Sequence, residues 1–216
     1  NMEQAVDWLR TQGLAKAEKK SGRTADECIV AVVTDGTNGA VVEINSETDF
    51  VARNDAFQSF VRKVAEKALT VNTLEELKAA EIDGKTVERT LTDLIATIGE
   101  HMAIRRMTRL SVSEGAVVGY VHSALADGLG KIGVLVGLQS SAGADVLQGL
   151  GKQVSMHVAA ANPQFLDKTS VDPDVLDRER NVLKEQAIAS GKPAEIAEKM
   201  VDGRIRKFYQ EICLTE

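Results

Sequence analysis

Residues 28–45 decide the fold, and they read CIVAVVTDGTNGAVVEIN. Two β-rich runs, from Cys28 to Thr34 and from Ala40 to Asn45, flank a turn sequence that is rich in glycine and asparagine. Branched apolar runs on both sides of such a turn are typical of a β-hairpin. We therefore expect two antiparallel strands here.

A helix and a further strand follow this hairpin. Asn54 can cap a helix with one apolar face, made of Phe57, Phe60, Val61, Val64, Ala65, Ala68 and Leu69. That face is expected to pack on the sheet. After a short helical piece and a turn, a second helix begins at Thr86 and ends at Gly99. The stretch from Ala103 to Val112 is β-compatible, and its arginines predict an edge strand of the same sheet.

The same order of elements then repeats. Strands are expected at 116–123 and 132–139, followed by a helix from about Ala144 to Ala160. This repetition predicts an α+β fold with two related subdomains, each with a small antiparallel sheet packed by helices.

Both ends of the chain are expected to be helical. Met2, Ala5, Val6 and Leu9 recur at helical spacing, and Gly13 stands where this first helix would stop, before a connector over 14–27. Near the other end, helices are expected at 174–190 and 193–214, with a turn at Gly191-Lys192-Pro193. Their apolar spacing predicts a protruding antiparallel coiled-coil hairpin, with seam positions Leu176, Leu183, Ala187, Ser190, Val201, Ile205, Phe208 and Ile212.

Composition excludes several classes of protein. The chain has 216 residues, of which 44% are hydrophobic and 27% charged, so a disordered or fibrous chain does not fit. A net charge of −6 argues against a partner held mainly through phosphates. The longest stretch without a charged residue, 153–166, is shorter than the ~20 apolar residues of a membrane span. We expect a cytoplasmic protein, with Cys28 and Cys213 as two buried free thiols.

The sequence offers little that is typical of an enzyme. The string Gly128-Leu129-Gly130-Lys131-Ile132-Gly133 satisfies GxGxxG, but the strand-like run after it favours a hairpin turn over a dinucleotide loop. The histidines at 101, 122 and 157 lack the spacing of metal ligands. We therefore expect no cofactor, no metal and no small-molecule substrate.

The unusual segment is the loop from Thr48 to Asn54. Phe50 and Val51 stand where a loop is normally polar, with Asp49 and Arg53 on either side. From the residues alone two interpretations stay open. Phe50 packs beneath the first helix as a staple, or it is an exposed anchor that enters a pocket of a partner.

At this loop the chain resembles a known family. The string Thr48-Asp49-Phe50-Val51-Ala52-Arg53-Asn54 is similar to the signature of bacterial translation elongation factor Ts, and further similar strings span almost the whole chain. They are Ala15-Lys16-Ala17, Ile98-Gly99-Glu100, Ile104-Arg105-Arg106, Met156-His157-Val158-Ala159-Ala160, Gly191-Lys192-Pro193 and Ile196-Ala197-Glu198-Lys199-Met200-Val201.

The resemblance implies a guanine nucleotide exchange factor for the GTPase elongation factor Tu, and a binding protein that is not an enzyme. In that family the loop matching Asp49 and Phe50 enters the G domain and disturbs the magnesium site. The partner-binding residues expected by this resemblance are Thr48, Asp49, Phe50, Val51, Ile98, Gly99 and His122. Ile98 as a core residue and His122 as an ordinary strand histidine remain alternatives.

The resemblance also suggests how the chain is divided. Residues 1–27 match the end of an N-terminal helical module and a connector, 28–113 a first core subdomain, 114–171 a second one and 172–216 the coiled-coil hairpin. We expect a residual N-terminal helix, and a second sheet without its last strand. Two alternatives from other classes stay open, a nucleotide-dependent enzyme using the 128–133 loop and an RNA-binding ribosome accessory protein using Arg105, Arg106 and Arg109.

Overall fold

The structure, a computed structural model, describes residues 2–191 and 193–216, apart from the side chains of Met2, Ala5, Val6, Leu9, Arg10, Gln12 and Ala194. The chain divides into two compact units, Asn1–Ala159 and Ala160–Glu216. None of the helices in the described part of the chain has the length and apolar character that a membrane crossing requires.

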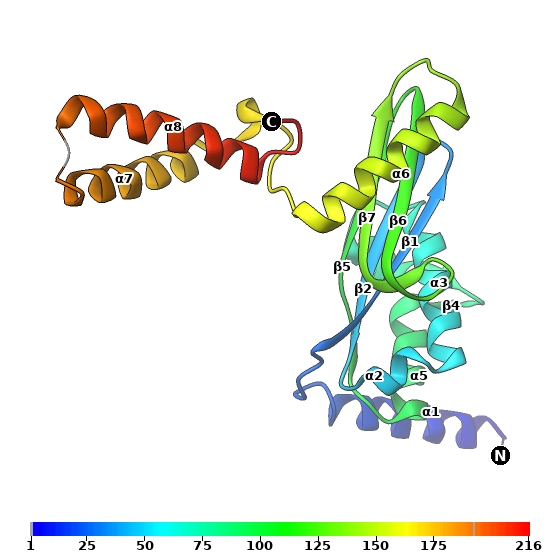
Figure 1. The fold of residues 1–216 in the computed structure, drawn as a ribbon. Coiled ribbons are helices and arrows are strands. Elements are labelled where there is room, and N and C mark those ends of the chain that lie inside the picture. The colour runs from blue at the N-terminus through cyan, green and yellow to red at the C-terminus, as the bar shows by residue number, and fades with distance from the viewer. Residues whose placement is uncertain (1, 192) are drawn as a thin grey trace. The chain divides into compact units, whose positions relative to one another are not determined.

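The first unit is built from strands and helices in the predicted order (Figure 1). Its strands are β1 (Glu27–Asp35), β2 (Asn38–Ser46), β3 (Glu81–Ile82), β4 (Lys85–Thr86), β5 (Met102–Ser111), β6 (Gly115–Ala126) and β7 (Leu129–Gln139). Its helices are α1 (Met2–Glu18), α2 (Asp49–Ala52), α3 (Asp55–Ala68), α4 (Leu74–Ala79), α5 (Val87–Ile98) and α6 (Ala144–Ala161).

The predicted hairpin of β1 and β2 is confirmed. Asp35 pairs with Asn38, so Gly36 and Thr37 form the turn. Gly36 has a φ of 56°, a value that glycine adopts without steric cost. The third strand is also confirmed, because β5 pairs antiparallel with β2 at one edge of the sheet.

The expectation of two separate sheets is wrong. The strands form one five-stranded sheet in the order β5-β2-β1-β7-β6, next to a small β3-β4 hairpin. The β6-β7 hairpin joins through two pairs only, Val30 with Gly130 and Ala31 with Leu129. Sequence analysis assigned Leu129 and Gly130 to a turn, whereas β7 begins at Leu129 and reaches β1. The two hairpins nevertheless keep separate apolar cores.

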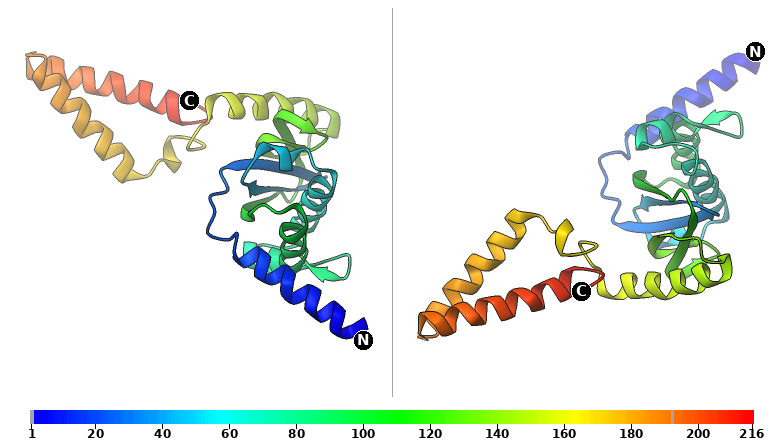
Figure 2. Two further views of the ribbon diagram at one scale, coloured as in Figure 1. Left: turned by 90° about the horizontal axis from the view of Figure 1, so that it is seen from below. Right: turned by 90° about the horizontal axis from the view of Figure 1, so that it is seen from above.

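The larger core lies between the β1-β2-β5 strands and the helices α3 and α5 (Figure 2). The predicted apolar face of α3 is confirmed, since Phe57, Phe60, Val61, Val64, Ala65 and Ala68 are all buried. They pack against residues that alternate along the hairpin, namely Ile29, Ala31, Ala40, Val42 and Ile44. This core holds β2 and α3 in place, and the loop that joins them runs between two fixed ends.

The β6-β7 hairpin packs closely on the β1-β2 strands and carries α6 on another side. A Cβ at Gly133 would lie 2.5 Å from Val30 Cγ1 and 2.7 Å from Val32 Cγ2, so only glycine allows this approach. On α6, a Cβ at Gly151 would lie 2.4 Å from Val118 Cγ2 of β6. Glycines at these contacts bring strand and helix backbones together without side chains between them.

The first helix extends further than its glycine suggests. We expected α1 to stop at Gly13, but it continues to Glu18, and the connector covers only the residues from there to β1. A Cβ at Gly13 would lie 3.7 Å from Ala96 Cβ of α5. Packing on α5 (Figure 2) thus offsets the ~1 kcal/mol that glycine costs inside a helix. The predicted apolar stripe of Met2, Ala5, Val6 and Leu9 lies outside the described side chains.

The second unit consists of the turn η1 (Lys168–Ser170) and the helices α7 (Pro173–Ala189) and α8 (Ala194–Ile212). Leu183 and Ala187 of α7 pack with Val201 and Ile205 of α8, as the spacing predicts for a helical hairpin. Gly191 in the connecting turn has a φ of 67°, and Lys192 lies outside the described residues. The coiled-coil geometry and the projection of this hairpin stay predictions.

The two cysteines are free thiols, in part as expected. Cys213, directly after α8, is buried, and burial raises the pKa of its thiol. Cys28 of β1 is only half-buried, so the expectation of two buried thiols holds for Cys213 alone.

Candidate functional site

The candidate site is the segment between β2 and α3, which folds as the four-residue helix α2. Within this helix Phe50 is 76% exposed, while Val51 and Ala52 are 3% and 4% exposed. The staple interpretation is therefore wrong, because the Phe50 ring does not pack beneath the first helix. Val51 belongs to the apolar core, so its side chain does not reach the surface.

The backbone on both sides of Phe50 is fixed by hydrogen bonds. Arg53 N donates to the Phe50 carbonyl at 3.1 Å, and Asn54 N donates to the Val51 carbonyl at 2.9 Å. Asn54 Oδ1 accepts a hydrogen bond from Phe57 N at 3.0 Å and so caps α3, as its residue type predicts. The exposed ring therefore stands on an ordered support, which lowers the entropy that binding a partner would cost.

A second turn, after α5, is joined to this loop by two glutamates. Glu100 accepts hydrogen bonds from Thr48 N at 2.9 Å and from Thr48 Oγ1 at 2.7 Å. In the opposite direction, Glu47 Oε1 accepts a hydrogen bond from His101 N at 2.5 Å. Each turn thus supplies a carboxylate to the backbone of the other. We call these contacts of Glu47, Thr48, Glu100 and His101 the double brace.

The double brace changes the acidity of one of its members. The His101 N–H, and next to it the positive charge of Arg23, hold the pKa of Glu47 below its usual value. Arg23 Nη1 lies 3.4 Å from Glu47 Oε2. Glu47 therefore stays ionised, which keeps it a strong acceptor for the His101 amide.

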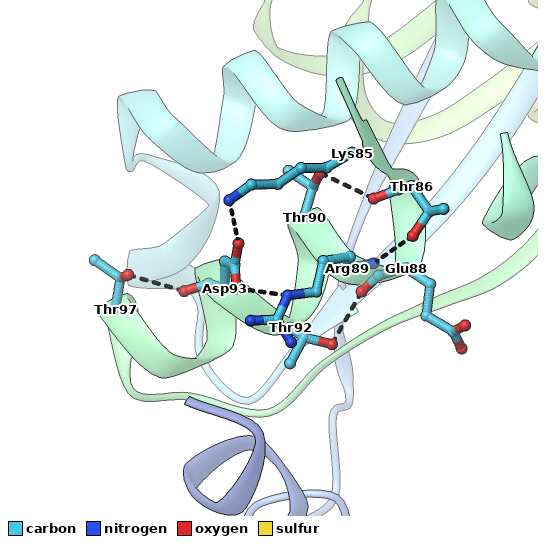
Figure 3. Close-up of polar contacts among 8 residues, drawn as sticks. All are labelled: Lys85, Thr86, Glu88, Arg89, Thr90, Thr92, Asp93 and Thr97. Carbon is cyan, nitrogen blue, oxygen red and sulfur yellow. Dashed lines mark hydrogen bonds and ion pairs between the residues drawn. The ribbon is translucent and has the colours of Figure 1, made fainter. Parts of the chain in front are cut away.

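Helix α5 delivers Ile98 and Gly99 to the same place. Thr86 caps its start by accepting from Arg89 N at 3.1 Å, and Asp93 pairs with both Lys85 and Arg89, at 2.6 Å and 3.2 Å (Figure 3). Three threonines on α5, Thr90, Thr92 and Thr97, add hydrogen bonds to the carbonyls of Thr86, Glu88 and Asp93. These contacts stabilise the helix up to the turn that meets the loop.

The end of α5 defines the environment of Ile98 and Gly99. Ile98 is half-buried and packs against the apolar core, as the alternative for this residue predicted. Gly99 has a φ of 89° and terminates the helix in the left-handed region. Both residues sit directly before Glu100, so the double brace holds them beside Thr48.

His122 belongs to another part of the sheet. It is exposed on β6, and its Nδ1 lies 3.0 Å from the Tyr120 hydroxyl. Its hydrogen bond is to Tyr120, and the 47–54 loop contributes nothing to it. The structure therefore brings Thr48, Asp49, Phe50, Ile98 and Gly99 together and leaves His122 on a separate surface.

Sequence analysis missed several residues that support the loop. They are Lys20, Arg23, Glu47, Glu100 and His101, of which only Glu100 stood in a family-like string. Thr48 and Glu100 are 52 positions apart, and no local pattern joins them. The only signal in the sequence was a glutamate directly beside each of the two turns.

The alternative functions find no support in the geometry. Gly128 lies in the turn between β6 and β7 with a φ of 71°, and the strand β7 follows it where a dinucleotide site needs a helix. Arg106 pairs with Glu43, Arg109 donates to Asn72 and Asn38, and Arg105 donates to the Ala25 carbonyl, so each arginine has a partner within the chain. Among the described residues no group of three or more His, Cys, Asp or Glu could hold a metal ion.

Comparison with known proteins agrees with this arrangement. The family model described as "Elongation factor TS" matches residues 47–216. The elongation factors Ts of Paramagnetospirillum magneticum and Rhodospirillum centenum are 59% and 58% identical over all of this chain, which covers 70% and 71% of their lengths. That of Gluconobacter oxydans is 57% identical, again over all of this chain, which covers 72% of its length.

These similarities define the class of the protein first. It is a translation elongation factor, and it acts in protein biosynthesis. The chain belongs to the elongation factor Ts family.

Proposed function

We propose that this chain is a guanine nucleotide exchange factor for the GTPase elongation factor Tu, and that the Asp49–Phe50 loop is the part that enters the G domain. The observation that carries the proposal is the exposed Phe50 ring between buried neighbours, on a loop that is hydrogen-bonded at both ends. An exposed aromatic residue on a fixed backbone is typical of a binding hot spot. On this proposal the chain accelerates nucleotide release and carries out no covalent chemistry itself.

Each residue of the site takes a different part. Phe50 enters an apolar pocket of the GTPase, and Asp49, exposed beside it, acts on polar groups near the magnesium site. Val51 contributes from within the core by anchoring the loop. Thr48, Ile98 and Gly99 form the base on which the loop stands, and His122 touches the partner at a second surface.

Thermodynamics restricts how such a factor works. A protein that binds the free and the nucleotide-loaded GTPase equally well would shift nothing, so this chain must prefer the empty state. By linkage, GDP lowers the affinity of the GTPase for the factor as much as the factor lowers its affinity for GDP. Displacement is then reciprocal, and the factor leaves when a new nucleotide binds.

The size of the effect requires more than one contact. Burial of one Phe side chain gives about 1.5–3 kcal/mol. A 10⁴-fold acceleration needs about 5.5 kcal/mol, at about 1.36 kcal/mol per decade. The remainder is assigned to the loss of magnesium coordination and to the surface around His122.

The proposal is tested by the release of a fluorescent GDP analogue from elongation factor Tu at limiting exchange factor. Phe50→Ala should slow release by about one to two decades, the change that corresponds to the burial of one Phe side chain. Val146→Ala removes a 64% exposed apolar side chain from α6 and is the matched control, with no change expected. Equal rates for the wild type and Phe50→Ala would refute the proposal.

The cytoplasmic location and the division of the chain at 27, 113 and 171 stay predictions beside this function. We also keep the expectation that membranes, nucleic acids and small-molecule substrates are not direct ligands.

A further inference from the structure

The connector between α1 and β1 passes both turns of the candidate site. Lys20 Nζ donates a hydrogen bond to the Gly99 carbonyl, and Arg23 lies against Glu47. One lysine of the connector thus holds the turn after α5, and one arginine reaches the turn after β2. In Figure 1 the end of α1 lies close to α2 and α5, which agrees with these contacts.

A positive charge is well placed at the Gly99 carbonyl. The last turn of a helix has carbonyl groups without partners and the negative end of the helix dipole. Helix α5 has no lysine or arginine in its own last turn. Lys20 supplies the missing cation from a segment 79 positions away, and its contact with Gly99 is partly buried. Partial burial weakens the screening of this interaction by salt.

The contact continues to the loop through the double brace. Gly99 is followed by Glu100, which holds Thr48 through two hydrogen bonds. Thr48 is the residue before α2, and α2 carries Asp49 and Phe50. The position of Phe50 therefore depends on Lys20 through a short series of polar contacts, all within the first unit.

We propose that Lys20 is a positioning residue for nucleotide exchange, which holds the turn after α5 and thereby fixes the orientation of the Asp49–Phe50 loop. This inference rests on the function proposed above. Lys20 acts through the loop, and its effect on exchange depends on Phe50.

The chain offers a matched control beside Lys20. Lys19 is exposed, and its side chain makes no hydrogen bond or ion pair within the described residues. Lys19→Ala removes the same charge one position away. Lys20→Arg keeps a positively charged donor at the original position.

The experiment is a double-mutant cycle on GDP release from elongation factor Tu. Lys20→Ala should slow release about two- to fivefold, the range expected for a cation at a helix C-terminus, while Lys19→Ala and Lys20→Arg should keep the wild-type rate. In the Phe50→Ala background, Lys20→Ala should cause no further loss, since coupled residues are not additive. An equal loss in both backgrounds, or a loss with Lys20→Arg as large as with Lys20→Ala, would overturn the proposal.

A second measurement uses the isolated protein. Lys20→Ala should speed amide hydrogen exchange at Thr48 and His101 about two- to fivefold and leave the amides of the β1-β2 hairpin unchanged. Unchanged exchange at Thr48, or faster exchange throughout the first unit, would contradict a positioning role. If Phe50→Ala itself leaves GDP release unchanged, the proposed function fails, and amide exchange alone still decides whether Lys20 holds the loop.

Discussion

The Thr48 hydroxyl donates a hydrogen bond to Glu100 Oε1 at 2.7 Å, across 52 positions of the chain. With the Thr48 amide on Oε2 of the same carboxylate, it makes Glu100 the link between the end of α5 and the loop that carries Phe50. Two short turns that are each mobile in isolation thus become one support. The following predictions concern this support and the scaffold beneath it.

Replacement of Glu100 by Gln should loosen the loop. The amide has one oxygen in place of two and carries no charge, so one of the two bonds from Thr48 is lost and the other weakened. We expect a loss of about 1–2 kcal/mol in the free energy of unfolding, measured by urea denaturation, and slower GDP release. Glu81→Gln, at an exposed position of β3, is the control and should change neither quantity. Full stability of Glu100→Gln would show that the double brace contributes nothing.

The stability of the first unit should depend on the ionisation of Glu47. The pKa of Glu47 in the folded state lies below its usual value of 4.5, so folding favours the carboxylate. The stabilisation is complete above pH 4.5 and disappears as the pH falls through the lower, folded-state pKa. Glu47→Gln should therefore be less stable than the wild type near pH 7, and the difference should shrink under acid conditions.

This pH dependence can be measured as urea midpoints of both proteins between neutral and acid pH. A difference that stays constant over the whole range would mean that Glu47 does not titrate with folding.

Gly99→Ala should destabilise the end of α5. Its φ of 89° lies in the left-handed region, where a side chain costs about 1 kcal/mol or more. Gly149→Ala in the middle of α6 should act in the opposite direction and stabilise by about 0.5–1 kcal/mol, because a Cβ there meets nothing within 4 Å. Thermal unfolding of the two variants tests the contrast. Two shifts of the same sign would be incompatible with these backbone conformations.

Gly133→Ala should disturb the packing of the β6-β7 hairpin on β1. The added carbon would lie 2.5 Å from Val30 Cγ1, so the strands would have to separate, at a cost of about 1–3 kcal/mol. Gly143→Ala, before α6, is the control, since nothing lies within 4 Å of a Cβ at that position. Equal unfolding midpoints for both variants would contradict the close approach of these strands.

The local elements of this protein could be predicted from short-range patterns. The turn between β1 and β2, the Asn54 cap and the buried face of α3 each depend on residues within a few positions of one another. Gly13 is the instructive failure, because a residue that usually ends a helix is overruled by packing on α5. Propensity is a weak preference, and tertiary contacts of similar energy override it.

The importance of Phe50 followed from its unusual place in a loop and from the resemblance that the loop carries, and both can be read along the chain. Its exposure, the burial of Val51, the joining of β7 to β1 and the contacts of Lys20, Glu47 and Glu100 arise only once distant segments meet. Periodicity records which face of an element is apolar. It carries no information on which polar side chain, tens of positions away, will meet a free backbone group, because that choice is made by the packing of the whole unit.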